Sequence, residues 1–216
     1  MRAWIAGATG LTGAALLNEL LREPQIDRVV AFVRHPLSVV DHKLTETAAD
    51  FEHLREGNHG FVDAAFCCLG TTIKTAGSVA AFRQVDHDYV LSFAAAAKAH
   101  GAGHFGVVSS MGANATSRLF YNRVKGETER DLRQVGFASL AIYQPSILVG
   151  NRQEQRPAER IGTILAQALS PLMLGPLRKY RAIRVTTLAK AMLRQSLAAR
   201  SGVEVYESDV IEELGK

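Results

Sequence analysis

The strongest constraint on the fold is a short glycine-rich segment close to the start of the chain. Its residues are Gly7, Ala8, Thr9, Gly10, Leu11, Thr12 and Gly13. It lies between the apolar run 3–6 and the helical spacing of residues 14–21. Glycines at this spacing let the backbone turn sharply and approach a phosphate closely, and free N–H groups at the helix start favour an anion. The segment predicts a strand, a turn and a helix that bind a dinucleotide, with a purely steric turn as the alternative.

Apolar runs rich in β-branched residues recur along the chain and alternate with segments of helical spacing. Strands are expected at residues 4–6, 29–33, 64–69, 105–108 and 141–148. Helices are expected at residues 11–22, 80–100, 119–135, 160–169 and 187–199, with a short helix near 50–55 and a brief strand nearby. Alternating strands and helices build a parallel sheet. We therefore expect an α/β fold, a Rossmann-type doubly wound parallel sheet, in a single domain over 1–216 with a small substrate-side cap segment at about 150–186.

The composition indicates a globular protein of ordinary size. The chain has 216 residues, of which 47% are hydrophobic and 21% are charged, and such a chain can bury a sizeable core. No apolar run reaches the roughly 18 residues of a membrane span, and the first residues lack the pattern of a signal peptide. On these grounds we expect a cytoplasmic protein without a membrane span.

The charge pattern argues against a nucleic-acid partner. The formal net charge is +4, and among the late basic residues only Tyr180 is interleaved as a platform for a base. Cys67 and Cys68 are adjacent in a predicted strand and point to opposite faces, so they are expected to be free thiols. No metal site is predicted.

The residue that follows the second predicted strand indicates which dinucleotide binds. In folds of this type, the side chain about 20 residues after the glycine turn lies beside the adenosine ribose. Arg34 takes this place, and its guanidinium group can pair with a 2′-phosphate, whereas a carboxylate would bind the 2′-hydroxyl. His35 can add a donor. The sequence therefore favours NADP(H) over NAD, with an exposed arginine that binds nothing as the alternative.

The loop after the strand 64–69 is expected to pass the adenine-ribose and pyrophosphate side of this cofactor. Leu69, Gly70 and Thr71 lie there, at the carboxyl edge of the predicted sheet and next to its topological switch point. Gly70 would permit a close backbone approach. A plain turn at this glycine is the alternative.

Hydroxyl groups and a lysine follow the next predicted strand and suggest proton transfer. Ser109 and Ser110 end the strand, and Tyr121 and Lys125 are spaced so that they share one face of a helix. The ammonium of Lys125 would favour the Tyr121 phenolate, while a serine hydroxyl holds a substrate oxygen. We expect a hydride-transfer site of Tyr121, Lys125 and one serine, Ser109 being slightly favoured over Ser110. A surface lysine above a half-buried tyrosine is the alternative.

With these residues assembled, the chain resembles the atypical short-chain dehydrogenase/reductase superfamily, and within it the Tat-interactive-protein-like NAD(P)-binding branch. The resemblance rests on residues 7–13, 66–72, 85–90, 109–113, 121–127 and 151–157. It implies a Rossmann-type domain that holds NADPH, with Tyr121 as the proton donor or acceptor and Lys125 on the nicotinamide ribose. It also implies that Leu148 and Arg156 lie near the cofactor.

Two classes of function follow. The first is an NADP-dependent oxidoreductase that acts on an unidentified small carbonyl or alcohol. The alternative is an NADPH-sensing regulatory or protein-interaction module with little or no turnover, because the branch includes proteins known for regulatory partners. A protein partner or a homodimer contact is left open for the segment around 157–184. An epimerase of nucleotide-linked sugars ranks lowest, because only about 70 residues follow Ile147 and a sugar-nucleotide lobe needs more.

Overall fold

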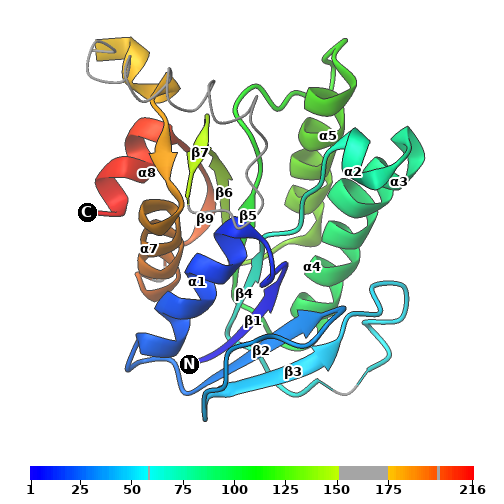
Figure 1. The fold of residues 1–216 in the computed structure, drawn as a ribbon, viewed down its shortest axis with the longest axis vertical. Coiled ribbons are helices and arrows are strands. Elements are labelled where there is room, and N and C mark those ends of the chain that lie inside the picture. Colours follow the sequence, from blue (N-terminus) through cyan, green and yellow to red (C-terminus); the bar gives the residue numbers. More distant parts are fainter. Residues whose placement is uncertain (58, 151–174, 199) are drawn as a thin grey trace.

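A single parallel sheet of seven strands forms the centre of the protein (Figure 1). The computed structural model describes residues 1–57, 59–150, 175–198 and 200–216. The strands are β1 (Arg2–Ala6), β2 (Arg28–Val33), β3 (Leu44–Ala48), β4 (Ala64–Cys67), β5 (His104–Val108), β6 (Ser139–Gln144) and β9 (Gly202–Glu207). Their order is β3-β2-β1-β4-β5-β6-β9, so the chain reverses its direction of travel between β1 and β4. This reversal is the topological switch point at which such sheets bind ligands.

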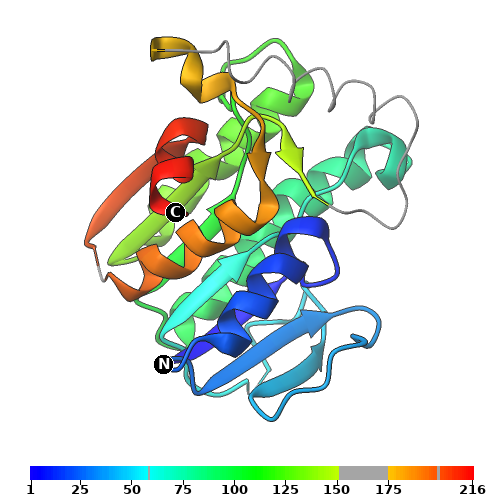
Figure 2. The same ribbon diagram turned by 60° about the vertical axis from the view of Figure 1, so that its left-hand side comes forward.

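Helices cover both faces of this sheet (Figures 1 and 2). On one face lie α1 (Leu11–Arg22), α7 (Val185–Leu197) and α8 (Ser208–Leu214). On the other face lie α4 (Tyr89–Ala99) and α5 (Phe120–Val135). The short helices α2 (Ile73–Ala76) and α3 (Val79–Arg83) lead into a π-helical turn, η1 (Gln84–Asp88), and then directly into α4. A small second sheet pairs β7 (Leu148–Val149) with β8 (Ile183–Arg184), which follows the 3-10 turn η3 (Gly175–Tyr180).

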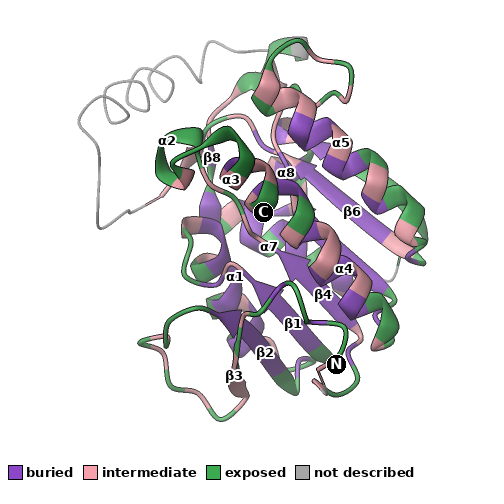
Figure 3. Cartoon of the chain, turned by 90° about the vertical axis from the view of Figure 1, so that its right-hand side faces the viewer, coloured by how far each residue is buried: buried purple, intermediate pink, exposed green. Residues whose placement is uncertain are grey.

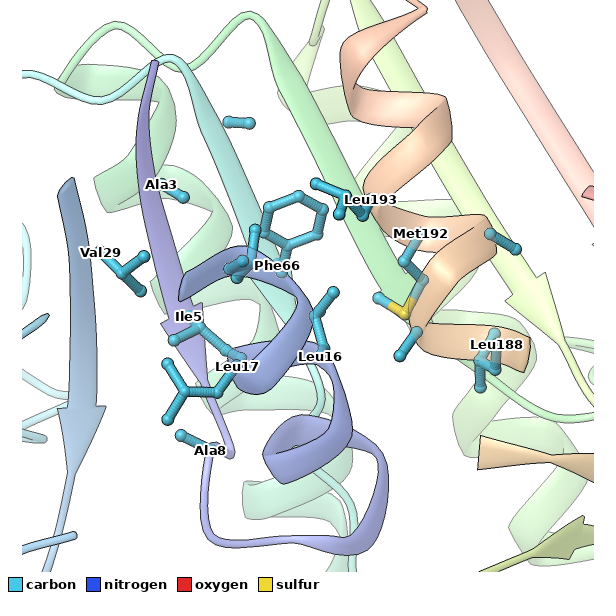
Figure 4. Close-up of a cluster of buried hydrophobic side chains, with 14 of the residues drawn as sticks. Ala3, Ile5, Ala8, Leu16, Leu17, Val29, Phe66, Leu188, Met192 and Leu193 are labelled. Carbon is cyan, nitrogen blue, oxygen red and sulfur yellow. The ribbon is translucent and has the colours of Figure 1, made fainter. Parts of the chain in front are cut away.

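The core consists of two apolar layers, one on each side of the sheet. Figure 3 shows that β1, β2, β4 and β6 are buried over most of their length, as expected for strands covered on both faces. Figure 4 shows Ile5, Leu16, Phe66 and Met192 packed between the sheet, α1 and α7. Trp4, Phe32, Phe93, Phe105 and Leu140 belong to the layer on the α4 and α5 side.

These observations confirm the expected doubly wound parallel sheet in a single domain. The bounds predicted for α1 agree with the structure. The expected helix over 80–100 is present but is interrupted by η1. The expected strand over 141–148 divides into β6 and β7, because Pro145 lies between them and cannot donate a ladder hydrogen bond.

Other expectations were wrong or untested. Residues 51–56 form turns rather than the short helix expected near 50–55. The strand β9 and the helix α8 were not expected at all. The helix expected over 160–169, and most of the cap expected at about 150–186, lie outside the described residues. Among the helices that the structure describes, none combines the length and apolar character that crossing a membrane requires.

Candidate functional site

The glycine turn after β1 is sterically fixed. Gly7 has a φ of +84°, and a Cβ on it would lie 2.5 Å from the carbonyl oxygen of Cys68, at the end of β4. A Cβ on Gly13 would lie 2.0 Å from the carbonyl oxygen of Gly7, so α1 could not pack this close with any other residue there. The Gly10 N–H donates to the same Gly7 oxygen at 3.0 Å. The turn therefore joins β1, β4 and the start of α1 at the switch point.

The start of α1 is open to an anion. Gly10 precedes the helix without any side chain that caps it, and the first turn of the helix contains no acidic residue. Thr9 and Gly10 are exposed, while Ala8 and Thr12 are buried and Leu11 is half-buried. The first N–H groups of a helix have no partner within the helix and carry positive dipole character. This end of α1 therefore fits the pyrophosphate group of a dinucleotide.

Arg34 and His35 directly follow the carboxyl end of β2, which pairs with β1 up to Ala6 and Phe32. Both side chains are exposed. Neither has a polar or charged side-chain partner in the described part of the chain. A free guanidinium group therefore lies one strand away from the glycine turn.

A buried ion pair lies below the loop that follows β4. The Lys125 ammonium is 2.8 Å from Asp86 Oδ1, and both side chains are less than a tenth exposed. The Thr71 N–H donates to Asp86 Oδ2 at 2.9 Å, and a Cβ on Gly70 would lie 4.0 Å from Lys125 Nζ. Burial alone would lower the pKa of Lys125, but the charge of Asp86, joined by Tyr121, raises that pKa above its ordinary value.

Asp86 is the site residue that the sequence analysis missed. It lies in η1, the π-helical turn between α3 and α4, and such turns are frequent at functional sites. An acidic residue in a helical segment is normally a solvated surface group. The only signal in the sequence was its place in the block 85–90, which supported the family resemblance without a role of its own.

Tyr121 lies above this pair, on the first turn of α5. Its side chain is 39% exposed, and its ring centroid is 5.6 Å from that of Phe82 on α3. Its charge, together with that of Asp86, contributes to the raised pKa of Lys125. An exposed tyrosine therefore lies one helical turn from a buried lysine, as the spacing predicted.

The two serines differ in what their hydroxyl groups do. The buried Ser109 hydroxyl donates to Glu129 on α5, and Gln144 Nε2 donates to the two oxygens of the same carboxylate at 2.9 and 3.0 Å. Ser110 Oγ is also buried but has no hydrogen-bond partner among the described residues. The Ser109 hydroxyl is thus bonded within the packing of β5 against α5, whereas the Ser110 hydroxyl is without a partner in the described part of the chain. Which of the two faces a substrate stays a prediction.

Of the remaining residues predicted to bind the cofactor, Leu69 and Leu148 are described by the structure and Arg156 is not. Leu69 follows β4 and is half-buried, and Leu148 is half-buried in β7. The end of β7 comes close to the glycine turn, because a Cβ on Gly150 would lie 2.9 Å from Leu11 Cδ1. The structure therefore brings the glycine turn, the loop after β4, Lys125 and the end of β7 to one edge of the sheet.

Comparison with known proteins supports this interpretation. The model of a family described as NAD(P)H-binding matches residues 7–142. Protein HTATIP2 of Rattus norvegicus is 36% identical over 99% of this chain and 88% of its own length. Protein FMP52, mitochondrial, of Coccidioides immitis is 30% identical over 93% of this chain and 87% of its own length.

Solved structures with low sequence identity share the fold. UDP-glucose 4-epimerase of Thermotoga maritima has a TM-score of 0.69 at 13% identity and covers 100% of this chain and 80% of its own. The human epimerase family protein SDR39U1, solved with NADPH, has a TM-score of 0.64 at 16% identity and covers 96% of this chain and 74% of its own.

The relatives contradict the expected location of the protein and show the family to which the chain belongs. Several of them are named as mitochondrial proteins, which contradicts the expected cytoplasmic location. The family model begins at Gly7, the first glycine of the turn, and HTATIP2 is similar over almost the whole chain. The chain belongs to the NAD(P)H-binding atypical short-chain dehydrogenase/reductases, in their Tat-interactive-protein-like branch.

Proposed function

We propose that this protein is an NADP(H)-dependent oxidoreductase that acts on a small carbonyl or alcohol. The observation that carries the proposal is the exposed Tyr121 side chain, one helical turn from the buried Lys125, at the sheet edge where α1 begins uncapped. An accessible acid beside a fixed cation, next to a dinucleotide-binding turn, is an arrangement suited to proton transfer coupled to hydride transfer.

The cofactor would be held by groups along this edge. The N–H groups at the start of α1 would bind the pyrophosphate, and Leu69, Gly70 and Thr71 would line the adjacent side. Arg34, with His35 beside it, would pair with the 2′-phosphate and so select NADP(H) over NAD. Leu148 and Arg156 are proposed to lie near it as the family resemblance implies. When bound, NADPH supplies a hydride to the substrate carbon.

The protein's own groups would manage the proton. In the direction of reduction, the Tyr121 hydroxyl donates its proton to the carbonyl oxygen, and in oxidation the phenolate accepts it back. Lys125 stabilises the phenolate and can donate to the nicotinamide ribose, and Asp86 acts as a positioning residue that fixes Lys125. The free Ser110 hydroxyl, rather than that of Ser109, would donate a hydrogen bond to the substrate oxygen.

The side of the site near Tyr121 favours an apolar substrate. Phe82 contacts the rings of both Phe120 and Tyr121. Val79, one turn before Phe82 on α3, is 51% exposed, and Leu119, which precedes α5, is 67% exposed. Large apolar side chains that remain exposed next to a reactive group commonly form part of a ligand site. The first compounds to test are therefore small aromatic and aliphatic ketones and aldehydes.

Tyr121→Phe tests the proposal. The variant removes the proton donor and leaves the ring against Phe82, so NADPH affinity should stay within about twofold of wild type while turnover falls by about 100-fold or more. Ser110→Ala should also lower turnover, by about tenfold or more, and Ser109→Ala is its matched control. Turnover of Tyr121→Phe equal to that of wild type on any substrate would refute the role of Tyr121.

A second candidate function is an NADPH-sensing module with little or no turnover. It is favoured by the Asp86 carboxylate, which neutralises the Lys125 charge and so weakens its support of a phenolate. This candidate predicts that NADPH changes the pattern of limited proteolysis while no carbonyl compound is reduced. A proteolysis pattern that saturating NADPH leaves unchanged would count against it.

A further inference from the structure

A cleft lies at the end of the sheet opposite to the candidate site. Its volume is about 360 Å³, and it is lined by Arg2, Arg28, Val30, Thr45, Thr47, His59, Gly60 and Phe61. We call it the amino-edge cleft, because Arg2 and Arg28 are the first residues of β1 and β2. In Figures 1 and 2 this end of β2 and β3 lies near the N-terminus, away from the start of α1.

The cleft exists because one part of the sheet lacks a helical cover. The connection from β2 to β3 contains no helix. On each strand, alternate side chains point to the same face, and the register pairs Val30 with Thr45 and Phe32 with Thr47. On this face Val30 and Phe32 are buried, whereas Thr45 and Thr47 are less buried, and the loop with His59 and Phe61 forms the other wall of the cleft.

Two arginines lie side by side among the residues that line this cleft. The Asp63 carboxylate lies beside Arg2 but accepts its backbone N–H, at 2.7 Å. Arg2 and Arg28 are direct partners in the pairing of β1 with β2, and both are exposed. The Arg28 Nε donates only a long hydrogen bond, 3.4 Å, to Thr45 Oγ1. In the described part of the chain neither guanidinium group forms an ion pair. Like charges directly opposite each other destabilise a sheet, so an anion between them would relieve the repulsion.

The rest of the lining supplies donors and an apolar surface. Thr45 and Thr47 provide hydroxyl groups, and none of the described residues that line the cleft is acidic. The His59 ring packs against Trp4 and Phe32, with centroids 5.7 and 5.1 Å away. Burial, reinforced by the nearby His100, lowers the pKa of His59, so its ring adds no positive charge at pH 7, and the ring is hydrogen-bonded to the Leu54 backbone.

We propose that the amino-edge cleft binds a small organic phosphate monoester. Two guanidinium groups match the charge of about −1.5 to −2 on a phosphate monoester better than the single charge of a carboxylate. Its phosphate lies between Arg2 and Arg28, and its carbon part lies over Val30 and against the half-exposed Phe61 ring. The volume suits a small molecule rather than a simple ion. This site is separate from the dinucleotide turn and does not depend on the proposed activity.

Calorimetric titration of the full chain with phenyl phosphate and with inorganic phosphate, at constant ionic strength, tests the proposal. Phenyl phosphate should bind saturably and more tightly than inorganic phosphate, and Arg2→Gln and Arg28→Gln should each weaken it about tenfold or more. The matched control Arg22→Gln, at the exposed end of α1, should leave binding unchanged. Arg34→Ala should also leave it unchanged, which separates this cleft from the dinucleotide site.

Thermal unfolding gives a second measurement that also checks folding. Phenyl phosphate should raise the Tm of the wild-type protein and not that of Arg28→Gln, whose own Tm should equal or exceed that of wild type because a repulsion has been removed. Absence of saturable binding at millimolar concentrations would overturn the proposal. So would an equal loss of affinity in Arg22→Gln and Arg28→Gln, and equal affinity for the two probes would overturn the assignment to an organic ester.

Discussion

Removing the charge of Asp86 should destabilise the protein far more than a typical surface substitution. Asp86→Asn preserves the shape of the side chain and an oxygen that can accept the Thr71 N–H, but it leaves the Lys125 ammonium buried without its carboxylate. Breaking a buried pair in this way costs about 3–5 kcal/mol. For a chain of this length, that corresponds to a fall in Tm of about 6–20 °C.

A double-mutant cycle separates the pair from its surroundings. Lys125→Met leaves the buried Asp86 carboxylate without its cation, so it should also be costly, whereas Asp86→Asn with Lys125→Met leaves no uncompensated charge. We expect the double variant to be more stable than the sum of the single effects predicts, by about 1–3 kcal/mol. The assay is urea-induced unfolding at pH 7, with the free energies compared at equal m-values.

The pH dependence gives the same pair a second readout. Because the folded pKa of Lys125 is raised above its ordinary value of 10.5, its stabilising contribution is complete below that pH and is lost as the pH rises through the raised pKa. The wild-type protein should therefore lose stability in this alkaline range, and Asp86→Asn should lose less. Additive single effects, or an Asp86→Asn variant within about 0.5 kcal/mol of wild type, would refute the reasoning.

Three further results are expected. Burial lowers the pKa of His104 to about 4, so unfolding free energy should fall as the pH drops from 6.5 to 4, by about 3 kcal/mol, and less in His104→Gln. Gly13→Ala should abolish NADPH binding in calorimetry, because its Cβ would lie 2.0 Å from a carbonyl oxygen. Ser109→Ala should cost about 1–3 kcal/mol in urea unfolding, because a bond to a buried carboxylate is lost, whereas Ser110→Ala should stay within about 0.5 kcal/mol of wild type. The first expectation would be contradicted if His104→Gln lost as much unfolding free energy between pH 6.5 and 4 as wild type does. The second would be contradicted if Gly13→Ala bound NADPH with wild-type affinity. The third would be contradicted if Ser109→Ala and Ser110→Ala lowered the unfolding free energy equally.

Local patterns predicted the centre of the fold well. The strands β1, β2, β4 and β5 were visible because strands buried on both faces need nearly continuous apolar runs. The helix α1 was visible because glycines mark its start and its apolar residues recur with helical spacing. The strand β9 escaped notice because it lies at the edge of the sheet, where residues such as Glu204 remain exposed.

Other features depend on contacts that local patterns do not encode. Phe51 and Leu54 are both buried and are spaced like residues of a helix, yet they belong to turns packed under the sheet. The pairing of Asp86 with Lys125 requires the π-helical turn to face α5. The alternation of a strand predicts that Ser109 and Ser110, which directly follow β5, point in opposite directions. Only the position of Glu129 reveals which of the two hydroxyls is already bonded.

The central claim is that the edge of the sheet around the start of α1 binds NADP(H), with Arg34 as the reader of the 2′-phosphate. The most direct test is a calorimetric titration of wild type and Arg34→Ala with NADPH and NADH. We predict that wild type binds NADPH more tightly than NADH, and that Arg34→Ala weakens NADPH by about 10- to 100-fold while NADH is unaffected. Equal affinity of wild type for the two nucleotides, or no binding of either, would contradict the claim.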